Sequence, residues 1–208
     1  MLLQISLEVQ LNLIKLKTSV ILLDKVYKMG KRSNFERVER DFYPTPLEAV
    51  LPLLDHLPDD FTFAEPCAGK GDLVRHLENL GGTCTWASDI EHYPGARNIE
   101  WIDFSELSDD NVSDSNFIIT NPPWNRKILH PMIEHFSSLR PTWLLFDADW
   151  AHTKQSAPYI EKCAKIVSVG RVKWFGNMTG KDNCAWYLFY NNTPDTTTKI
   201  DTEFYGRT

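Results

Sequence analysis

The chain has 208 residues and a net charge of -6, with 42% hydrophobic residues and seven tryptophans. This length corresponds to about one domain, and the hydrophobic content is sufficient for a buried core, so a largely disordered chain is excluded. The acidic balance argues against a protein that coats duplex nucleic acid by bulk electrostatic attraction. Any contact with a polynucleotide must therefore be local.

The cysteines and histidines do not have the spacing of a metal site. The four cysteines form no CxxC pair, and none of the six histidines has a histidine four residues away. We therefore expect no metal and no disulfide framework. Reduced, buried thiols in a cytoplasmic protein are the simplest interpretation.

Residues 1–40 precede the domain as an N-terminal extension. From Leu3 to Leu13, apolar and polar residues alternate, which is typical of a half-buried strand. Charged residues interrupt residues 1–28 too often for a bilayer span, and no basic start precedes an apolar run. We therefore predict neither a transmembrane helix nor a signal peptide, and no membrane partner. Because Met29 opens abruptly into domain-like sequence, one hypothesis makes it the authentic start.

A helix is expected to begin at Thr45, within the stretch Tyr43-Pro44-Thr45-Pro46. Thr45 and Glu48 have the spacing of a capping box, and Pro46 occupies the first helical position. The helix should extend to about Leu57. Its apolar face would comprise Leu47, Val50, Leu51 and Leu54.

A strand, a glycine-containing loop and a second helix follow. The strand is expected at Phe61–Ala64, the loop runs from Glu65 to Gly71, and the helix covers Asp72–Leu80. Small residues and two glycines between a strand and a helix allow a ligand to approach the backbone closely, where the amides of the helix N-terminus face it. Gly81-Gly82 ends the helix.

Asp89 follows the next predicted strand, Thr83–Ser88, about 20 residues beyond the glycine loop, where it could accept hydrogen bonds from both hydroxyls of a ribose. Dinucleotide dehydrogenases share this feature. The Gly-x-Gly-x-x-Gly pattern of those enzymes is absent, because Val74 stands three residues after Gly71. A further strand is expected at Asn98–Ile102, and Asp103 follows it. The Asp103 side chain could serve only to cap the following turn.

The stretch Asn121-Pro122-Pro123-Trp124 comes directly after an apolar run, Asn116–Ile119, that predicts a buried strand. Two prolines stiffen the backbone and leave its carbonyls free to accept. The Asn121 carboxamide oxygen and the Pro122 carbonyl could each accept one N–H of a planar amino group, while Trp124 stacks on the attached ring. A plain turn is the alternative, since Asn-Pro often opens turns.

The second half of the chain continues the alternation of helices and strands. A helical face is followed by a strand at Thr142–Phe146, and an antiparallel pair is expected from Lys165–Val169 and Ala185–Tyr190. The helical face comprises Ile128, Leu129, Met132, Ile133 and Phe136. The polar residues 191–208 form a tail that we expect to be poorly ordered.

Several residues in this half are candidate contacts to a nucleic-acid substrate. Trp150 could lie near the substrate or in the core. The loop between Arg171 and Asn183 mixes basic and aromatic residues, which can hold phosphate and stack a base, although a solvated hairpin explains it equally well. The candidate basic residues are Arg126, Lys127, Lys173 and Lys181.

Residues 41–190 resemble the class I S-adenosylmethionine-dependent amino-methyltransferases, notably the N6-adenine DNA methyltransferases of bacteria and their phages. The resemblance rests on Asn121-Pro122-Pro123-Trp124, with Tyr43-Pro44-Thr45-Pro46 and the glycine loop upstream of it. It implies a Rossmann-like α/β fold with a seven-stranded sheet, mostly parallel with one antiparallel strand. It also implies S-adenosyl-L-methionine as cofactor and an adenine flipped out of duplex DNA as substrate.

The resemblance further implies roles for particular residues. Glu65 would meet the amino group of the cofactor's methionine, Tyr43 and Thr45 would line its methionine end, and Asp103 would accept from its adenine. The implied catalytic residues are Asn121, Pro122, Pro123 and Trp124. The implied cofactor-binding residues are Tyr43, Thr45, Glu65, Pro66, Ala68, Gly69, Gly71, Asp89, Ile90, Asp103, Phe104 and Asn121.

The same motif is compatible with other functions. Asn-Pro-Pro followed by an aromatic residue also serves methylation of adenine in RNA and of glutamine in proteins, and no separate target-recognition domain fits into 208 residues. A catalytically silent scaffold that binds the cofactor is a third alternative. The intact Asn121, Pro122, Glu65 and Asp89 argue against the scaffold.

Overall fold

The computed structural model describes residues 43–96, 98–174, 182–190 and 201–207. The chain divides into two units, Met1–Glu36 and Arg37–Thr208, and all of the described residues belong to the second. The predictions for residues 1–28 and for Lys181 therefore lie outside the described residues, and the domain boundary near residue 41 stays a prediction. No described helix is both long and apolar enough to cross a membrane.

One sheet organises the second unit, with eight described strands in the order β3-β2-β1-β4-β5-β7-β6-β8. β7 runs antiparallel to both β5 and β6, whereas every other described pair is parallel. The predicted α/β fold with a single antiparallel strand is confirmed. The strands are β1 (Thr62–Glu65), β2 (Thr83–Asp89), β3 (Glu100–Trp101), β4 (Phe117–Thr120), β5 (Thr142–Asp147), β6 (Cys163–Arg171), β7 (Asn183–Phe189) and β8 (Glu203–Tyr205).

The eighth strand corrects part of the prediction for the tail, because Glu203–Tyr205 form β8 and add to the edge of the sheet beside β6, whereas residues 191–200 lie outside the described residues. Side chains reinforce the pairing. The Tyr205 ring packs edge-on against His56 with ring centroids 4.4 Å apart, and the Lys165 ammonium lies 3.9 Å from the Glu203 carboxylate. Phe204 and Tyr205 have a high propensity for strands. The polar residues around them make this short strand difficult to predict from the sequence.

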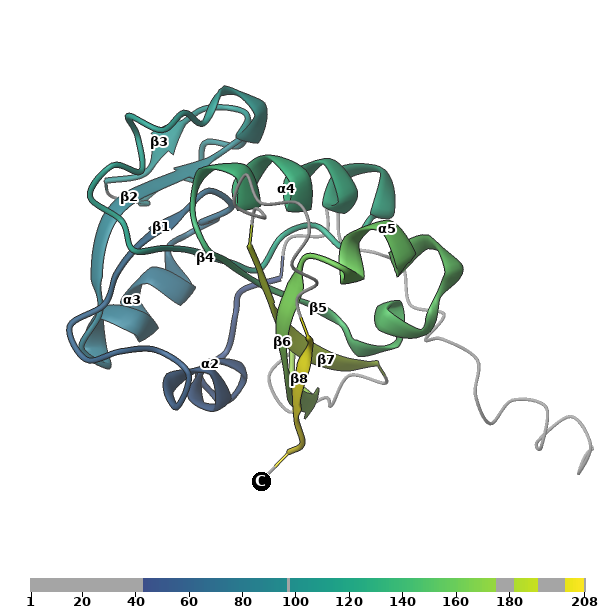
Figure 1. Cartoon of the computed structure of the whole chain (residues 1–208). Helices are drawn as coiled ribbons and strands as arrows, with labels where there is room; N and C mark the ends of the chain where they lie inside the picture. Colours follow the sequence, from purple (N-terminus) through teal and green to yellow (C-terminus); the bar gives the residue numbers. More distant parts are fainter. Residues whose placement is uncertain (1–42, 97, 175–181, 191–200, 208) are drawn as a thin grey trace, which may run out of the picture. The chain divides into compact units, whose positions relative to one another are not determined.

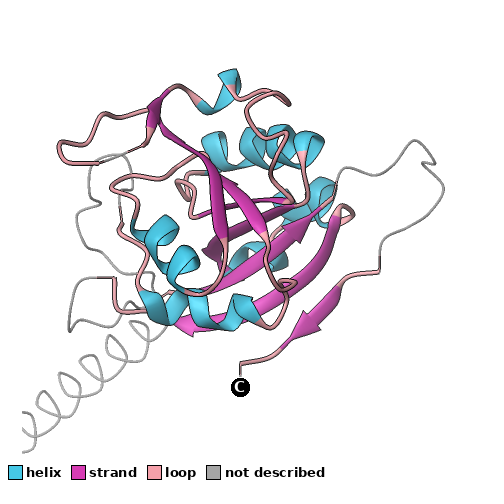
Figure 2. Ribbon diagram, turned by 90° about the vertical axis from the view of Figure 1, so that its left-hand side faces the viewer, coloured by secondary structure: helices cyan, strands magenta, loops and turns pink. Residues whose placement is uncertain are grey.

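Helices cover both faces of the sheet (Figures 1 and 2). α2 (Leu47–Leu54) and α3 (Asp72–Asn79) pack into one hydrophobic core, and α4 (Arg126–Leu139) packs into the other. Strand residues alternate between the two cores, as the pleat requires: Trp143 and Leu145 of β5 join the first, and Leu144 and Phe146 join the second. The remaining described helices are short, namely α5 (Ala157–Ile160) and the 3₁₀ turns η2 (Phe104–Glu106), η3 (Ala148–His152) and η4 (Lys154–Ser156).

The predicted capping box before α2 is wrong. The helix begins at Leu47 and has no side-chain cap. Glu48 Oε1 instead accepts from the backbone N–H of Lys173 at 2.6 Å, and Thr45 Oγ1 accepts from Asn121 Nδ2 at 3.1 Å. Partners distant in sequence have replaced the local ones, and Thr45 connects the start of α2 to the site described below.

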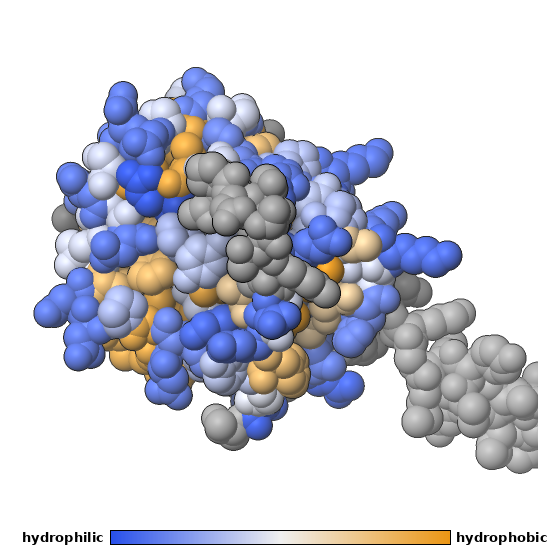
Figure 3. Space-filling model, in the orientation of Figure 1, coloured by the Kyte–Doolittle hydropathy of each residue, from blue (hydrophilic) through white to orange (hydrophobic). Residues whose placement is uncertain are grey.

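The predicted apolar face of α2 is also partly wrong. Ala49, Val50 and Leu53 are fully buried, whereas Leu47 and Leu51 are 43% and 48% exposed. The space-filling view shows hydrophobic side chains at the surface in the region of α2 and α3 (Figure 3). The helix is therefore rotated about its axis relative to the face that we expected.

Trp150 belongs to the core. It is 1% exposed and packs edge-to-face on Phe146 and Tyr187, which corrects its assignment as a substrate contact. Its indole N–H donates to Nε2 of His130 at 3.0 Å. An indole N–H only donates, so Nε2 of this imidazole carries no proton. Burial is the main cause that lowers the pKa of His130, and the positive charge of Arg126 lowers it further.

The lowered pKa of His130 predicts a pH-dependent stability. The folded protein binds this proton less readily than the unfolded chain does, so the stability contributed by neutral His130 is lost as pH falls below the ordinary imidazole pKa of about 6.5. We expect His130→Gln, whose amide oxygen can still accept from Trp150, to weaken the fall in melting temperature between about pH 7 and 5. Thermal unfolding across this range measures it, and an unchanged slope contradicts the assignment.

Candidate functional site

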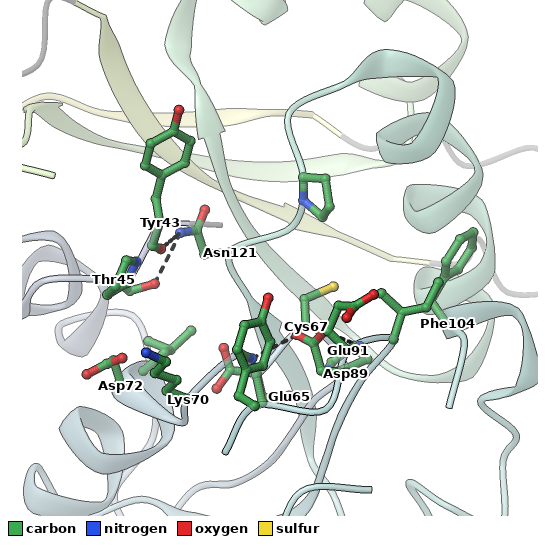
Figure 4. Close-up of a pocket in the computed structure, with 18 of the residues that line it drawn as sticks. Tyr43, Thr45, Glu65, Cys67, Lys70, Asp72, Asp89, Glu91, Phe104 and Asn121 are labelled. Carbon is green, nitrogen blue, oxygen red and sulfur yellow. Dashed lines mark hydrogen bonds between the residues drawn. The ribbon is translucent and has the colours of Figure 1, made fainter. Parts of the chain in front are cut away.

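The carboxyl ends of the central strands meet at the point where the strand order reverses. Glu65 ends β1, Asn121 follows its neighbour β4, and Asp89 ends β2. Open α/β sheets bind ligands at such a switch point. A cavity of about 720 Å³ lies here (Figure 4). The predicted residues that line it are Tyr43, Thr45, Glu65, Pro66, Ala68, Gly69, Asp89, Ile90, Asp103, Phe104, Asn121 and Pro123.

Other predicted residues do not line this cavity. Gly71 caps the start of α3 with a φ of 77° and borders a second, smaller cavity instead. Pro122 is buried beside Asn121. Arg126 bonds to the Gln155 side chain, and the backbone N–H of Lys173 bonds to Glu48. The remaining two that lie away from the cavity lining are Trp124 and Lys127.

Glu65 carries a buried carboxylate that is only partly paired. It is 2% exposed, and it accepts a hydrogen bond from the backbone of Val74 in the first turn of α3. Its Oε2 accepts no hydrogen bond from any described residue. Burial, reinforced by the negative charge of Asp89, raises the pKa of Glu65 well above its ordinary value. Such an oxygen is suited to a cationic N–H donor, because pairing would offset the penalty of burying its charge.

Asp89 is held rigidly at the end of β2. Its Oδ2 accepts from the backbone N–H of Gly69 at 2.8 Å, and its Oδ1 accepts from that of Glu91 at 2.9 Å. Each carboxylate oxygen has about two lone-pair sites, so both oxygens can also accept from a ligand. The conformation of the glycine loop therefore aims this carboxylate, and its geometry fits a pair of hydroxyl groups.

Asp103 caps a turn and also lines the cavity, so its position is compatible with both of the roles that the sequence left open. Its Oδ1 accepts from the backbone N–H and the hydroxyl of Ser105, at 2.9 and 2.6 Å, and so caps η2. Both hydrogen bonds lower the pKa of Asp103, and the bond from the Ser105 hydroxyl has the larger effect. The residue also lines the cavity, together with Phe104 and the half-exposed Ile90. A carboxylate and two apolar side chains in one cavity suit a planar aromatic ligand that carries an N–H.

The Asn121 carboxamide is fixed at both ends. Nδ2 donates to Thr45 Oγ1 at 3.1 Å and to the Tyr43 carbonyl at 3.4 Å (Figure 4). Oδ1 accepts from the indole N–H of Trp124 at 3.3 Å. Because a carbonyl only accepts and an indole N–H only donates, the network determines which end of the amide is which. The oxygen of Asn121 is thus held on the side away from Thr45.

Trp124 is turned toward the protein interior. Its indole N–H also donates to the Leu145 carbonyl at 3.2 Å, and the side chain packs against both hydrophobic cores. Its ring meets that of Trp174 edge-to-face, with centroids 5.9 Å apart, and Trp174 also contacts Tyr43 at 6.3 Å. Trp124 is therefore not among the residues that line the cavity, and its indole nitrogen is bonded to two acceptors of the protein.

Several cavity residues had no assigned role at the sequence level. Ile128 and Met132 reach the cavity from one face of α4, where their i, i+4 spacing was visible but suggested only core packing. Cys67 lies within the glycine loop, and burial raises the pKa of its thiol, so it stays protonated and is a poor nucleophile. The other unassigned residues of interest are Glu91, Tyr93 and Asn125.

The fold resembles that of known structures. The structure superimposes on a proposed RNA methyltransferase from Pyrococcus horikoshii with a TM-score of 0.54 and 16% identity, covering 78% of this chain and 94% of that one. The chain has a Rossmann-like methyltransferase fold. The Mtq2-Trm112 complex of E. cuniculi, responsible for methylation of the translation termination factor eRF1, gives a TM-score of 0.50 at 12% identity, covering 74% of this chain and 98% of that one.

The sequence comparisons show a more limited similarity. The Type II methyltransferase M.VspI of Vibrio sp. (strain 343) is 28% identical over 125 residues, covering 51% of this chain. The match spans 30% of the length of that relative. No protein-family model matches the chain. The fold is therefore established by structural similarity, and the chemistry must be argued from the site.

Proposed function

We propose that this protein is an S-adenosylmethionine-dependent methyltransferase that acts on an exocyclic amino nitrogen, N6 of adenine in DNA. The observation that carries the proposal is the Asn121 carboxamide, fixed by Thr45 and Tyr43 at the edge of the same cavity that contains Glu65 and Asp89. One end of this cavity fits a nucleoside with an amino acid attached. The other end offers a hydrogen-bond acceptor for an amino group.

The residues of the cavity fit S-adenosylmethionine. Glu65 Oε2, which is buried and has no hydrogen-bond donor among the described residues, accepts from the α-ammonium group, which supplies a cationic donor. Asp89 accepts from the ribose hydroxyls, and Asp103 accepts from the adenine amino group between Ile90 and Phe104. When bound, the cofactor supplies a methyl group on a positively charged sulfur.

Asn121 acts on the acceptor nitrogen. Its Oδ1 accepts one N–H of the substrate amino group, and the Pro122 carbonyl accepts the other. Both bonds draw the nitrogen away from conjugation with its ring, so its lone pair becomes available. No general base is required, because the nitrogen loses its proton after the methyl group has been transferred. The site therefore contributes by positioning and by electrostatics.

DNA is favoured as substrate by the order of the motifs, with Tyr43-Pro44-Thr45-Pro46 ahead of the glycine loop and Asn121 after it. The similarity to a protein named as a Type II methyltransferase points the same way. Arg126, Lys127 and Lys173 would supply local phosphate contacts. RNA and protein remain alternatives, because the structural neighbours include a proposed RNA methyltransferase and a complex that methylates a termination factor. We propose a cytoplasmic location.

Transfer of tritiated methyl groups to DNA, tRNA, rRNA and a protein lysate, each assayed separately, tests the proposal. We expect incorporation into DNA, and digestion to nucleosides should yield N6-methyladenine. Incorporation into RNA or protein alone would replace the proposed substrate. Binding of S-adenosylmethionine without transfer to any of the four would favour the silent scaffold.

Asp89→Ala is expected to raise the dissociation constant for S-adenosylmethionine by about 10-fold to 100-fold, since it removes two hydrogen bonds to a charged group. Isothermal titration calorimetry measures the change. Asp149→Ala is the matched control, because Asp149 is an exposed carboxylate in η3 that does not line the cavity. Equal affinity in the two variants would contradict the ribose assignment.

A further inference from the structure

We propose that Thr45 is a positioning residue, whose hydroxyl holds the amino end of the Asn121 carboxamide so that the oxygen end meets the substrate. The inference rests on the proposed function, because it concerns the residue that grips the acceptor nitrogen. It differs from the role that the sequence resemblance implies for Thr45, which is contact with the methionine end of the cofactor.

The two ends of a carboxamide have nearly the same shape, so neighbouring groups alone select its orientation. With Oδ1 facing the substrate, Asn121 accepts an N–H. After a flip, Nδ2 would face the substrate and two donors would oppose each other. The Tyr43 carbonyl, which only accepts, and the Trp124 indole N–H, which only donates, select the first orientation. The Thr45 hydroxyl accepts the shorter of the two hydrogen bonds from Nδ2, at 3.1 Å against 3.4 Å for the Tyr43 carbonyl, so it holds the amide in the selected orientation.

The position of Thr45 is set by the protein itself. Thr45 is only 5% exposed, so little water competes for its oxygen. The following helix is anchored to β7, because the buried indole N–H of Trp186 donates to the Ala49 carbonyl at 2.8 Å. Glu48 anchors it again through the backbone of Lys173 at 2.6 Å. The hydroxyl is thus pre-positioned beside Asn121 before any ligand binds, which is what a positioning residue requires.

Thr45→Val tests the inference, because valine keeps the shape of threonine and removes the hydroxyl. We expect kcat for methyl transfer to fall about tenfold or more, which corresponds to one lost hydrogen bond, while KM for S-adenosylmethionine changes less than about twofold. Thr45→Ser keeps the oxygen and should restore most of kcat. Thr142→Val is the matched control. Thr142, in β5, is also buried, but its hydroxyl donates to the Arg140 carbonyl and it does not line the cavity.

Two kinetic results would overturn the inference. An unchanged kcat in Thr45→Val would show that the hydroxyl is not needed to hold the Asn121 carboxamide in place. A raised KM for S-adenosylmethionine with an unchanged kcat would assign Thr45 to cofactor binding instead. Failure of Thr45→Ser to recover kcat would point to a packing role, because that variant lacks only the methyl group.

A second measurement separates this inference from the proposed function. In ¹⁵N-labelled protein, the side-chain amide of Asn121 is identified by its disappearance in Asn121→Asp. We expect its hydrogen exchange to be slow in the wild type and at least about tenfold faster in Thr45→Val. If the wild type transfers no methyl group to any substrate, the proposed function fails, yet this signal still decides the contact. Equal exchange in the two proteins overturns the positioning role.

Discussion

Replacing Asn121 with alanine is expected to abolish methyl transfer while leaving the affinity for S-adenosylmethionine nearly unchanged. The carboxamide oxygen acts on the amino group of the substrate, whereas the ammonium, ribose and adenine contacts of the cofactor are assigned to Glu65, Asp89 and Asp103. Loss of one pre-organised polar group at a reacting centre lowers turnover by about 10²-fold to 10³-fold in other enzymes. We expect a loss of at least this size.

Single-turnover transfer of a radioactive methyl group measures the effect of Asn121→Ala, and calorimetry measures its affinity for the cofactor. Asn111→Ala is a suitable control, because Asn111 bonds only locally to the backbone and hydroxyl of Ser108, in a turn that does not line the cavity. Turnover of Asn121→Ala equal to that of the wild type would show that another group activates the acceptor.

The sequence predicted most of the sheet because its signals are local. The apolar runs that became β1, β4 and β5 are short and continuous, and each is followed by polar or small residues that mark its end. The sites at the strand ends follow directly from that placement. Glu65, Asp89 and Asn121 could be assigned to one cavity because parallel strands bring their carboxyl ends to the same edge.

The errors occur where tertiary contacts outcompete local ones. Thr45 and Glu48 have the spacing of a capping box, yet both side chains bond to residues more than 70 positions away. A local pattern carries no information about such partners, because a cap contributes only about 1 kcal/mol and a buried tertiary hydrogen bond contributes as much. The same limit hid the pairing of β8 with β6, which joins residues far apart in sequence.

The orientation of the Trp124 side chain differs from the one that the sequence predicted. The aromatic ring was expected to face the substrate, but its indole N–H bonds to Asn121 and to the Leu145 carbonyl. A phenylalanine at this position could not make either bond. The choice of tryptophan therefore couples the aromatic residue to the orientation of the Asn121 carboxamide, on the end opposite to the one that Thr45 holds.

Glu65→Gln is expected to weaken cofactor binding and, at the same time, to stabilise the protein without cofactor. The substitution keeps the size of the side chain and removes its charge. Loss of a charge-assisted hydrogen bond to the ammonium group of about 1.5–3 kcal/mol would raise the dissociation constant for S-adenosylmethionine about 10-fold to 150-fold. Stability should change in the opposite direction, because a buried carboxylate beside Asp89 is unfavourable in the absence of a partner.

The pH dependence distinguishes this explanation from a general effect on packing. The pKa of Glu65 is raised on folding, so the folded protein holds this proton more tightly than the unfolded chain. The stability contributed by protonated Glu65 is therefore fully present below the ordinary carboxyl pKa and is lost as pH rises toward the raised value. Thermal unfolding of the cofactor-free protein should show this loss in the wild type and not in Glu65→Gln. Glu161→Gln, at an exposed position, is the control.

Binding of the cofactor should also release protons from wild-type Glu65. The ammonium group favours the ionised carboxylate, so whatever fraction of Glu65 is protonated beforehand must lose its proton to the buffer. Calorimetry in two buffers of different ionisation enthalpy would detect this release in the wild type, and its absence in Glu65→Gln. If both proteins bound S-adenosylmethionine equally tightly with the same proton release, Glu65 would not be the ammonium acceptor, because a neutral amide at this position cannot take up or lose that proton.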